Sequence, residues 1–92
     1  MVYNPAMSSL GTIDSSITET IRKAIVAAIE DADVEVVGGG GHFTIQVCST
    51  VFEGKNMVQS QRLVYSAISH LMAGDNAPLH AVDSLITKTP GQ

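Results

Sequence analysis

The stretch that decides the fold reads VEVVGGGGHFTIQVCSTVFEGK and runs from Val34 to Lys55. Two runs rich in β-branched residues, 34–37 and 43–48, flank four consecutive glycines. The second run alternates apolar and polar residues, which is typical of a strand with one packed face. Because glycine readily adopts positive φ angles, Gly38–Gly41 predicts a flexible hairpin connection between two antiparallel strands.

On both sides of this hairpin, apolar residues recur at helical spacing. Upstream, the pattern predicts an amphipathic helix over residues 16–32, with a capping box between Ser16 and Glu19 at its start. Downstream, Phe52 is expected to fix a sharp turn to the core, and a second helix is predicted over residues 57–72. The expected apolar stripe of this second helix comprises Met57, Val64, Ile68, Leu71 and Met72, broadened by Val58 and Tyr65.

A third strand is predicted over residues 79–87, after Gly74 and Pro78 have ended the second helix. The element order is then α-β-β-α-β. Because a strand–helix–strand crossover normally places its two strands parallel in one sheet, the third strand should lie parallel to the second. The sequence therefore predicts an α/β (α+β) domain over residues 13–92 with a three-stranded mixed sheet, preceded by a flexible tail over residues 1–12.

Composition and charge limit the function classes. The 92 residues are 45% apolar, which suits one globular domain, and they carry a formal net charge of −4. Non-specific nucleic-acid affinity comes mostly from lysine and arginine side chains that neutralise phosphates. Since a local basic patch could draw only on Lys55, Arg62 and Lys88, we expect weak nucleic-acid binding or none.

The cysteine count and the hydropathy pattern bear on the compartment. Cys48 is the single cysteine, so it cannot form a disulfide within this chain, and a reducing compartment fits best. No run approaches the roughly 18 apolar residues of a membrane span, and residues 1–10 lack the pattern of a secretion signal. We expect a cytoplasmic protein without a membrane segment. A mitochondrial or other organellar matrix protein that has lost its targeting peptide would look the same.

Two histidines stand out as candidate metal ligands. If the second and third strands are parallel, His42 and His80 lie at the same edge of the sheet, whereas Cys48 lies about 20 Å away at 3.3 Å per residue. Imidazole suits zinc, copper and iron, but two histidines are too few for a closed mononuclear site, so further ligands would come from a second molecule. The competing interpretation is two unrelated surface histidines. His70, on the second helix, is interpreted as a solvent-edge residue.

Other chemistries find little support in the sequence. Gly38–Gly41 matches the G-x-x-G loop of KH nucleic-acid-binding modules, but there the loop joins two helices, whereas here it joins two strands and carries no basic residue. Cys48 in mid-strand is interpreted as a packing residue, not as a nucleophile. No pair of carboxylates and no serine-centred triad is recognisable, so no enzymatic function is predicted.

Residues 17–90 resemble the BolA family. The resemblance rests on four motifs: G-H-F at 41–43, V-F-E-G-K at 51–55, V-Q followed by Q-R-L-V-Y at 58–65, and L-H-A-V at 79–82. It implies a KH-like fold with a mixed three-stranded sheet and the helices on one face, which agrees with the order derived above.

The resemblance also implies a function. BolA-like proteins pair with monothiol glutaredoxins in heterodimers that bridge a 2Fe-2S cluster, and a homodimer is an alternative assembly. The family's ligand histidine near the C-terminus corresponds to His80, and the second ligand, in the loop between the first two strands, corresponds to His42. Glutaredoxin cysteine and glutathione would ligate the other iron. The implied role is iron–sulfur trafficking or iron-status signalling. Some relatives are described as transcription regulators, so a KH-like nucleic-acid-binding regulator using Lys55 and Arg62 is the alternative.

Two departures from the family pattern bear on these expectations. Where many members carry a basic run, this chain has Ser60-Gln61-Arg62, which weakens the case for DNA contact. Between His80 and Thr89-Pro90 the chain is one residue longer than usual, around Asp83-Ser84. The extra residue predicts a bulge that shifts the register of the last strand.

Overall fold

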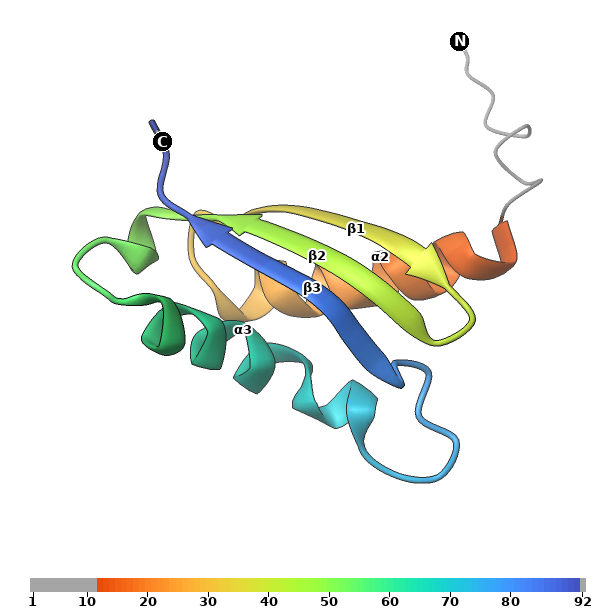
Figure 1. Cartoon of the computed structure of the whole chain (residues 1–92). Coiled ribbons are helices and arrows are strands. Elements are labelled where there is room, and N and C mark those ends of the chain that lie inside the picture. Colours follow the sequence, from red (N-terminus) through yellow and green to blue (C-terminus); the bar gives the residue numbers. More distant parts are fainter. Residues whose placement is uncertain (1–11, 92) are drawn as a thin grey trace, which may run out of the picture.

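The computed structural model describes residues 12–91. Within these residues six elements follow one another (Figure 1): α2 (Thr12–Ala28), β1 (Asp33–Gly39), β2 (His42–Cys48), the short 3₁₀ helix η2 (Thr50–Phe52), α3 (Met57–Met72) and β3 (Ala81–Lys88). Apart from the single turn of η2, this is the predicted order α-β-β-α-β.

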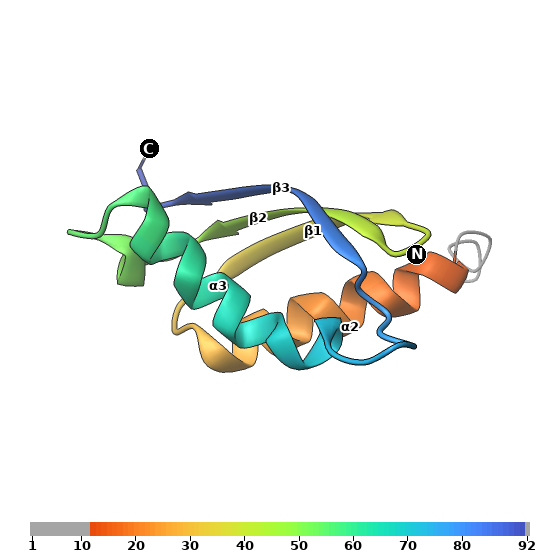
Figure 2. The same ribbon diagram turned by 60° about the horizontal axis from the view of Figure 1, so that its bottom comes forward.

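The three strands form one mixed sheet in the order β1-β2-β3. Strand β1 pairs antiparallel with β2, and β2 pairs parallel with β3, as predicted. Both helices cover the same face of the sheet, and no described element covers the other face (Figure 2). This open face carries exposed apolar side chains such as Val37 and Ile86.

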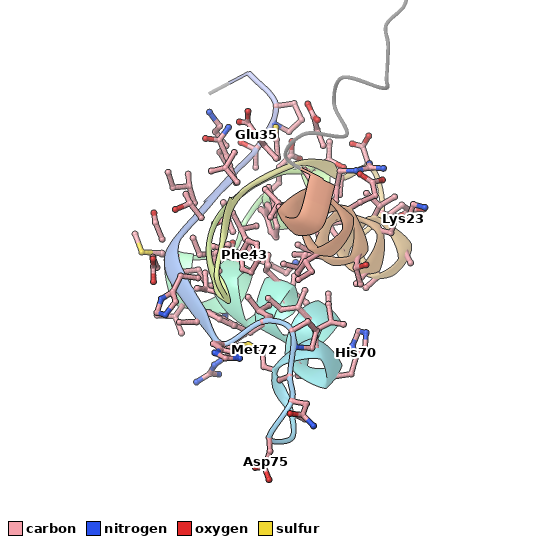
Figure 3. The ribbon with its side chains drawn as sticks, turned by 90° about the vertical axis from the view of Figure 1, so that its right-hand side faces the viewer. Lys23, Glu35, Phe43, His70, Met72 and Asp75 are labelled. Carbon is pink, nitrogen blue, oxygen red and sulfur yellow. The ribbon has the colours of Figure 1, made fainter. Side chains whose placement is uncertain are left out.

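The core lies between the sheet and the two helices. Alternate residues of β2 point into it, and Phe43 can be seen there in the end-on view of Figure 3. They meet apolar side chains from α2, from α3 and from the turn before α3, which include Ile21, Ile25, Val64, Ile68 and Phe52. Each fully buried aliphatic side chain contributes roughly 1.5–3 kcal/mol. The predicted packed face of β2 and the predicted role of Phe52 are confirmed.

The bounds predicted for the first helix were wrong at both ends. Helix α2 begins by Thr12 and ends at Ala28, not at residues 16 and 32. Asp31 adopts a left-handed conformation with φ of 61°, which an α-helix cannot include, so the chain turns before β1.

Glu19 pairs with Arg22 one turn further along the helix, and this hydrogen bond lowers the pKa of the Glu19 carboxyl. The capping box predicted at Ser16 falls inside the helix. Residues 1–11 of the predicted tail lie outside the described residues.

The glycine run is more ordered than the prediction of a flexible connection. Gly38 and Gly39 belong to β1, and only Gly40 and Gly41 form the turn, with φ of 65° and 86°. Positive φ at both central residues is the requirement of a tight two-residue hairpin, which glycine meets without strain. The hairpin is therefore short, and β2 begins at His42 directly after it.

Helix α3 has the predicted bounds, but part of its predicted stripe was wrong. Val58 and Tyr65 are exposed because they lie off the buried face of the helix. Met57 lies on the same face as Val64 but is exposed at the start of the helix, where it lines an open pocket with Phe52 and Lys88. The start of α3 is capped by Asn56, whose side chain accepts a hydrogen bond from the Gln59 N–H, while the Gln59 side chain accepts one from the Asn56 N–H. This reciprocal capping box was not predicted.

The third strand is displaced by one or two residues from the prediction. Leu79 and His80 precede β3, and buried Leu79 donates its N–H to the Leu71 carbonyl at the end of α3. The predicted bulge is present. Phe43 pairs with Val82 but Thr44 pairs with Ser84, which leaves Asp83 as the extra residue.

Candidate functional site

The hairpin turn and the segment before β3 lie at one end of the sheet (Figure 1). The Gly41 carbonyl accepts two backbone hydrogen bonds, from the His80 N–H at 2.8 Å and from the Ala81 N–H at 2.9 Å. In the parallel register His42 pairs with Ala81. The backbone therefore holds His42 and His80 at the same edge, as the predicted parallel pairing requires.

The His80 ring lies directly over Gly41. A Cβ atom at Gly41 would stand 2.8 Å from His80 Cγ and 3.0 Å from His80 Nδ1, closer than side chains can pack. Gly41 is buried and has a positive φ, so two independent constraints favour glycine there. The importance of this particular glycine was missed in the sequence, where it is one of four.

The His42 side chain has a polar neighbour from β3. Its Nδ1 atom lies 3.2 Å from Oδ1 of Asp83, and the two side chains are 59% and 57% exposed. Asp83 is the residue that the bulge leaves out of the regular pairing. The sequence signalled the bulge but not this contact.

The donor chemistry of this edge fits one half of a 2Fe-2S centre. Two imidazoles replace two cysteines on one iron of Rieske-type centres, and here two exposed histidines stand at adjacent positions of the sheet edge. Metal-bound histidines commonly donate their other ring N–H to a carboxylate, and Asp83 stands in that relation to His42. Within residues 12–91, no group of three or more His, Cys, Asp or Glu side chains is arranged to hold a metal ion.

The remaining histidine lies on α3, and the cysteine lies at the far end of the sheet. His70 is in the last turn of α3 and points away from the core in Figure 3. Cys48 ends β2, opposite Asp33 on β1 and Lys88 on β3, so it occupies the far end of the sheet, as predicted. Its side chain does not pack into the core, contrary to the prediction, because it lines a shallow hollow of about 350 Å³ on the open face.

The two basic residues considered for nucleic-acid contact do not share a pocket. Lys55 donates from Nζ to the Val51 carbonyl at 3.0 Å, and with Lys88 it lines an open pocket of about 200 Å³ near the start of α3. Arg62 is exposed on α3 and is not among the lining residues. This pocket lies at the end of β3, opposite the edge that carries the histidines.

These features define a small mixed-sheet domain with two histidines at one edge of its sheet. The family model described as BolA-like protein matches residues 17–92. The chain therefore belongs to the BolA-like protein family.

Individual relatives agree with this assignment. BolA-like protein 1 from Mus musculus is 34% identical over 98 residues, which cover 91% of this chain and 69% of the mouse protein. A solved BolA protein homologue from Coxiella burnetii has a TM-score of 0.68 and 35% identity, covering 79% of this chain and 90% of that one. The BolA domain of SufE1 from Arabidopsis thaliana has a TM-score of 0.67 and 27% identity, covering 82% of this chain and 93% of that one. The fold class is thus that of solved BolA-like domains.

Proposed function

We propose that this chain is a non-enzymatic adaptor that pairs with a monothiol glutaredoxin and shares a bridging 2Fe-2S cluster with it. His42 and His80 would ligate one iron, and the glutaredoxin cysteine and glutathione would ligate the other. The biological role would be iron–sulfur cluster trafficking or iron-status signalling. The observation that carries the proposal is the pair of hydrogen bonds to the Gly41 carbonyl, which fixes the segment bearing His80 beside His42.

Exposure and charge at this edge support a shared cluster. Both histidines are exposed, so a second protein could reach their ring nitrogens without unfolding this one. A neutral imidazole offers one lone pair to a metal and adds no negative charge. Histidine ligation raises the potential of a 2Fe-2S centre relative to all-thiolate ligation, so the holo heterodimer should differ from a glutaredoxin homodimer in spectrum and potential.

Reconstitution tests this proposal. The chain is mixed anaerobically with a monothiol glutaredoxin, ferrous iron, sulfide and glutathione, and visible absorption and circular dichroism are recorded. We expect a heterodimer whose spectra differ from those of the glutaredoxin homodimer. His80→Ala should abolish this species or make it labile, while the apo chain stays folded and still associates with glutaredoxin. His70→Ala, which removes an exposed histidine of α3 that does not belong to the sheet, is the matched control. A folded His80→Ala chain with wild-type holo spectra would refute the ligand assignment.

His42→Ala should have a smaller effect, because a bridged cluster can recruit another donor in place of His42. We expect this variant to bind glutaredoxin but to hold a cluster with a shorter lifetime and an altered spectrum. An unchanged spectrum and lifetime would remove His42 from the site.

Cys48→Ser should leave the cluster unchanged, because Cys48 lies at the other end of β2. Loss of the holo heterodimer in a folded Cys48→Ser chain would show that the cluster sits elsewhere.

A KH-like nucleic-acid-binding transcription regulator is the second candidate function. The observation in its favour is that Lys55 and Lys88 line one pocket. The formal net charge of −4 opposes it, because phosphate contacts from basic side chains supply most of the affinity. We therefore rank it below the cluster-binding adaptor.

The cellular compartment of this chain and its association into a homodimer are predictions. No helix among the described residues has the length and apolarity needed to cross a membrane. The predicted location is the cytoplasm or an organellar matrix, and the predicted alternative assembly is a homodimer of the apo chain, which sedimentation velocity would detect.

A further inference from the structure

The bulge in β3 places two consecutive residues on the exposed side of the sheet. Val82 pairs with Phe43, and in a regular strand the next residue would pair with Thr44. Here Ser84 takes that position, and Asp83 and Ser84 are both exposed. The extra residue thus leaves Asp83 out of the pairing, on the exposed surface of the sheet beside His42, without interrupting the pairing downstream.

The contact between Asp83 and His42 selects a tautomer of the imidazole. The His42 Nδ1 atom lies 3.2 Å from Asp83 Oδ1. An ionised carboxylate can only accept hydrogen bonds, so a proton on Nδ1 makes this contact favourable, whereas a lone pair on Nδ1 would face a negative oxygen. In a neutral ring with its proton on Nδ1, the lone pair is on Nε2, the nitrogen that does not face Asp83.

The contact contributes little to the stability of the fold. Both side chains are more than half exposed, and exposed ion pairs typically add little to the stability of a fold because water screens them. What the contact does is orient the His42 ring. His42 comes directly after the glycine turn, and its side chain makes no other hydrogen bond within the described part of the chain.

We propose that Asp83 is a positioning residue: it holds His42 as the Nδ1–H tautomer and leaves Nε2 as the nitrogen that binds iron. This inference rests on the proposed function, because the iron belongs to the shared cluster. It adds to that function a residue that is not itself a ligand, Asp83, which lies at the one-residue bulge beside His42. Carboxylates that accept from the second nitrogen of a ligand histidine act in this way at metal sites, and their removal typically lowers metal affinity by about 10–100-fold.

The first test uses the apo chain and needs no cluster. Long-range ¹H–¹⁵N correlation spectra of the histidine rings, recorded where the imidazoles are neutral, report which nitrogen carries the proton. We expect the Nδ1–H form for His42 in the wild-type chain and a shift towards the other tautomer in Asp83→Ala. Asp83→Asn can accept through Oδ1 or donate through Nδ2, so it should keep part of the preference for the Nδ1–H form. Asp33→Ala, an exposed change at the far end of the sheet, is the control. The same His42 tautomer in wild type and Asp83→Ala overturns the inference.

The second test uses the holo heterodimer with glutaredoxin. Asp83→Ala should shorten the lifetime of the cluster about 10-fold or more and shift its midpoint potential, with Asp83→Asn restoring part of the lifetime. A wild-type lifetime and potential in Asp83→Ala overturn the inference and leave the proposed function intact. A wild-type chain that holds no cluster overturns the proposed function and the iron-binding part of this inference. The tautomer comparison then still decides whether Asp83 fixes the His42 ring.

Discussion

Gly41 links the fold of this protein to its candidate site at the scale of single residues. Its carbonyl accepts from the His80 and Ala81 N–H groups, its missing side chain leaves room for the His80 ring, and its positive φ completes the hairpin turn. Any side chain there would affect all three. Its neighbour Gly40 shares only the positive φ, because a methyl group added there would meet no atom of a non-neighbouring described residue within 4 Å.

This difference gives a paired prediction. Gly40→Ala should lower the free energy of unfolding by roughly 1–2 kcal/mol, the usual cost of a left-handed L-residue. Gly41→Ala should cost more, because the added methyl must also displace the His80 ring, and it should weaken cluster binding in the holo heterodimer. Denaturant unfolding measures the first effect, and the lifetime of the cluster measures the second. Equal losses of stability with unchanged cluster lifetime in both variants would contradict this account of Gly41.

Sequence could predict the positions of the two histidines but not the contacts around them. The parallel pairing follows from the crossover between β2 and β3, so His42 and His80 had to share an edge. The four glycines, by contrast, look identical in the sequence, and only the pairing register shows which two make the turn. The contact between His42 and Asp83 joins residues far apart in the chain and depends on side-chain directions at the bulge.

At the scale of elements, the two helices show what sequence signals can and cannot fix. The bounds of α3 were predictable because Gly74 and Pro78 follow it closely. Helix α2 ends at Ala28, and the chain then turns at Asp31, an aspartate in a left-handed conformation. No glycine or proline marks this end in the sequence. The apolar periodicity also continues to buried Ile29, so the pattern alone extends the helix too far.

The capping box of α3 provides a test at this scale. Asn56→Ala removes the side chain that accepts from the Gln59 N–H at 2.8 Å, and loss of such a cap typically costs about 1 kcal/mol. For a domain of this size, that corresponds to a decrease in Tm of about 4–8 °C. Asn76→Ala, in the exposed loop before β3, is the matched control for thermal unfolding followed by far-ultraviolet circular dichroism. Equal Tm values for the two variants would show that the cap contributes nothing.

At the scale of the whole molecule, the candidate metal ligands and the lysine-lined pocket lie at opposite ends of the sheet. The hairpin turn and the start of β3 lie at one end of the sheet, and the end of β3 lies at the other (Figure 1). The histidines belong to the first end, and the pocket with Lys55 and Lys88 belongs to the second. The net charge of −4 makes the molecule as a whole repel polyanions.

Nucleic-acid binding should therefore be weak. We expect the isolated apo chain to bind duplex DNA with a Kd above the micromolar range at physiological salt, measured by fluorescence anisotropy. Submicromolar binding that falls steeply with salt and is lost in Lys55→Ala would contradict this expectation and favour the regulator function. Arg62 lies outside the pocket, so Arg62→Ala removes one positive charge without changing the pocket. Comparing it with Lys55→Ala distinguishes binding at the pocket from an effect of net charge.

The central claim is that His42 and His80 ligate one iron of a shared cluster, and the most direct measurement of it is the coupling between the cluster and histidine nitrogens. Electron–nuclear double resonance is recorded on the reduced heterodimer, with this chain alone labelled with ¹⁵N-histidine. Two strongly coupled histidine nitrogens are predicted for the wild-type chain and for His70→Ala, and one for any cluster that His42→Ala retains. A cluster with no coupled histidine nitrogen from this chain, or with couplings that persist unchanged when His42 or His80 is replaced, would contradict the claim.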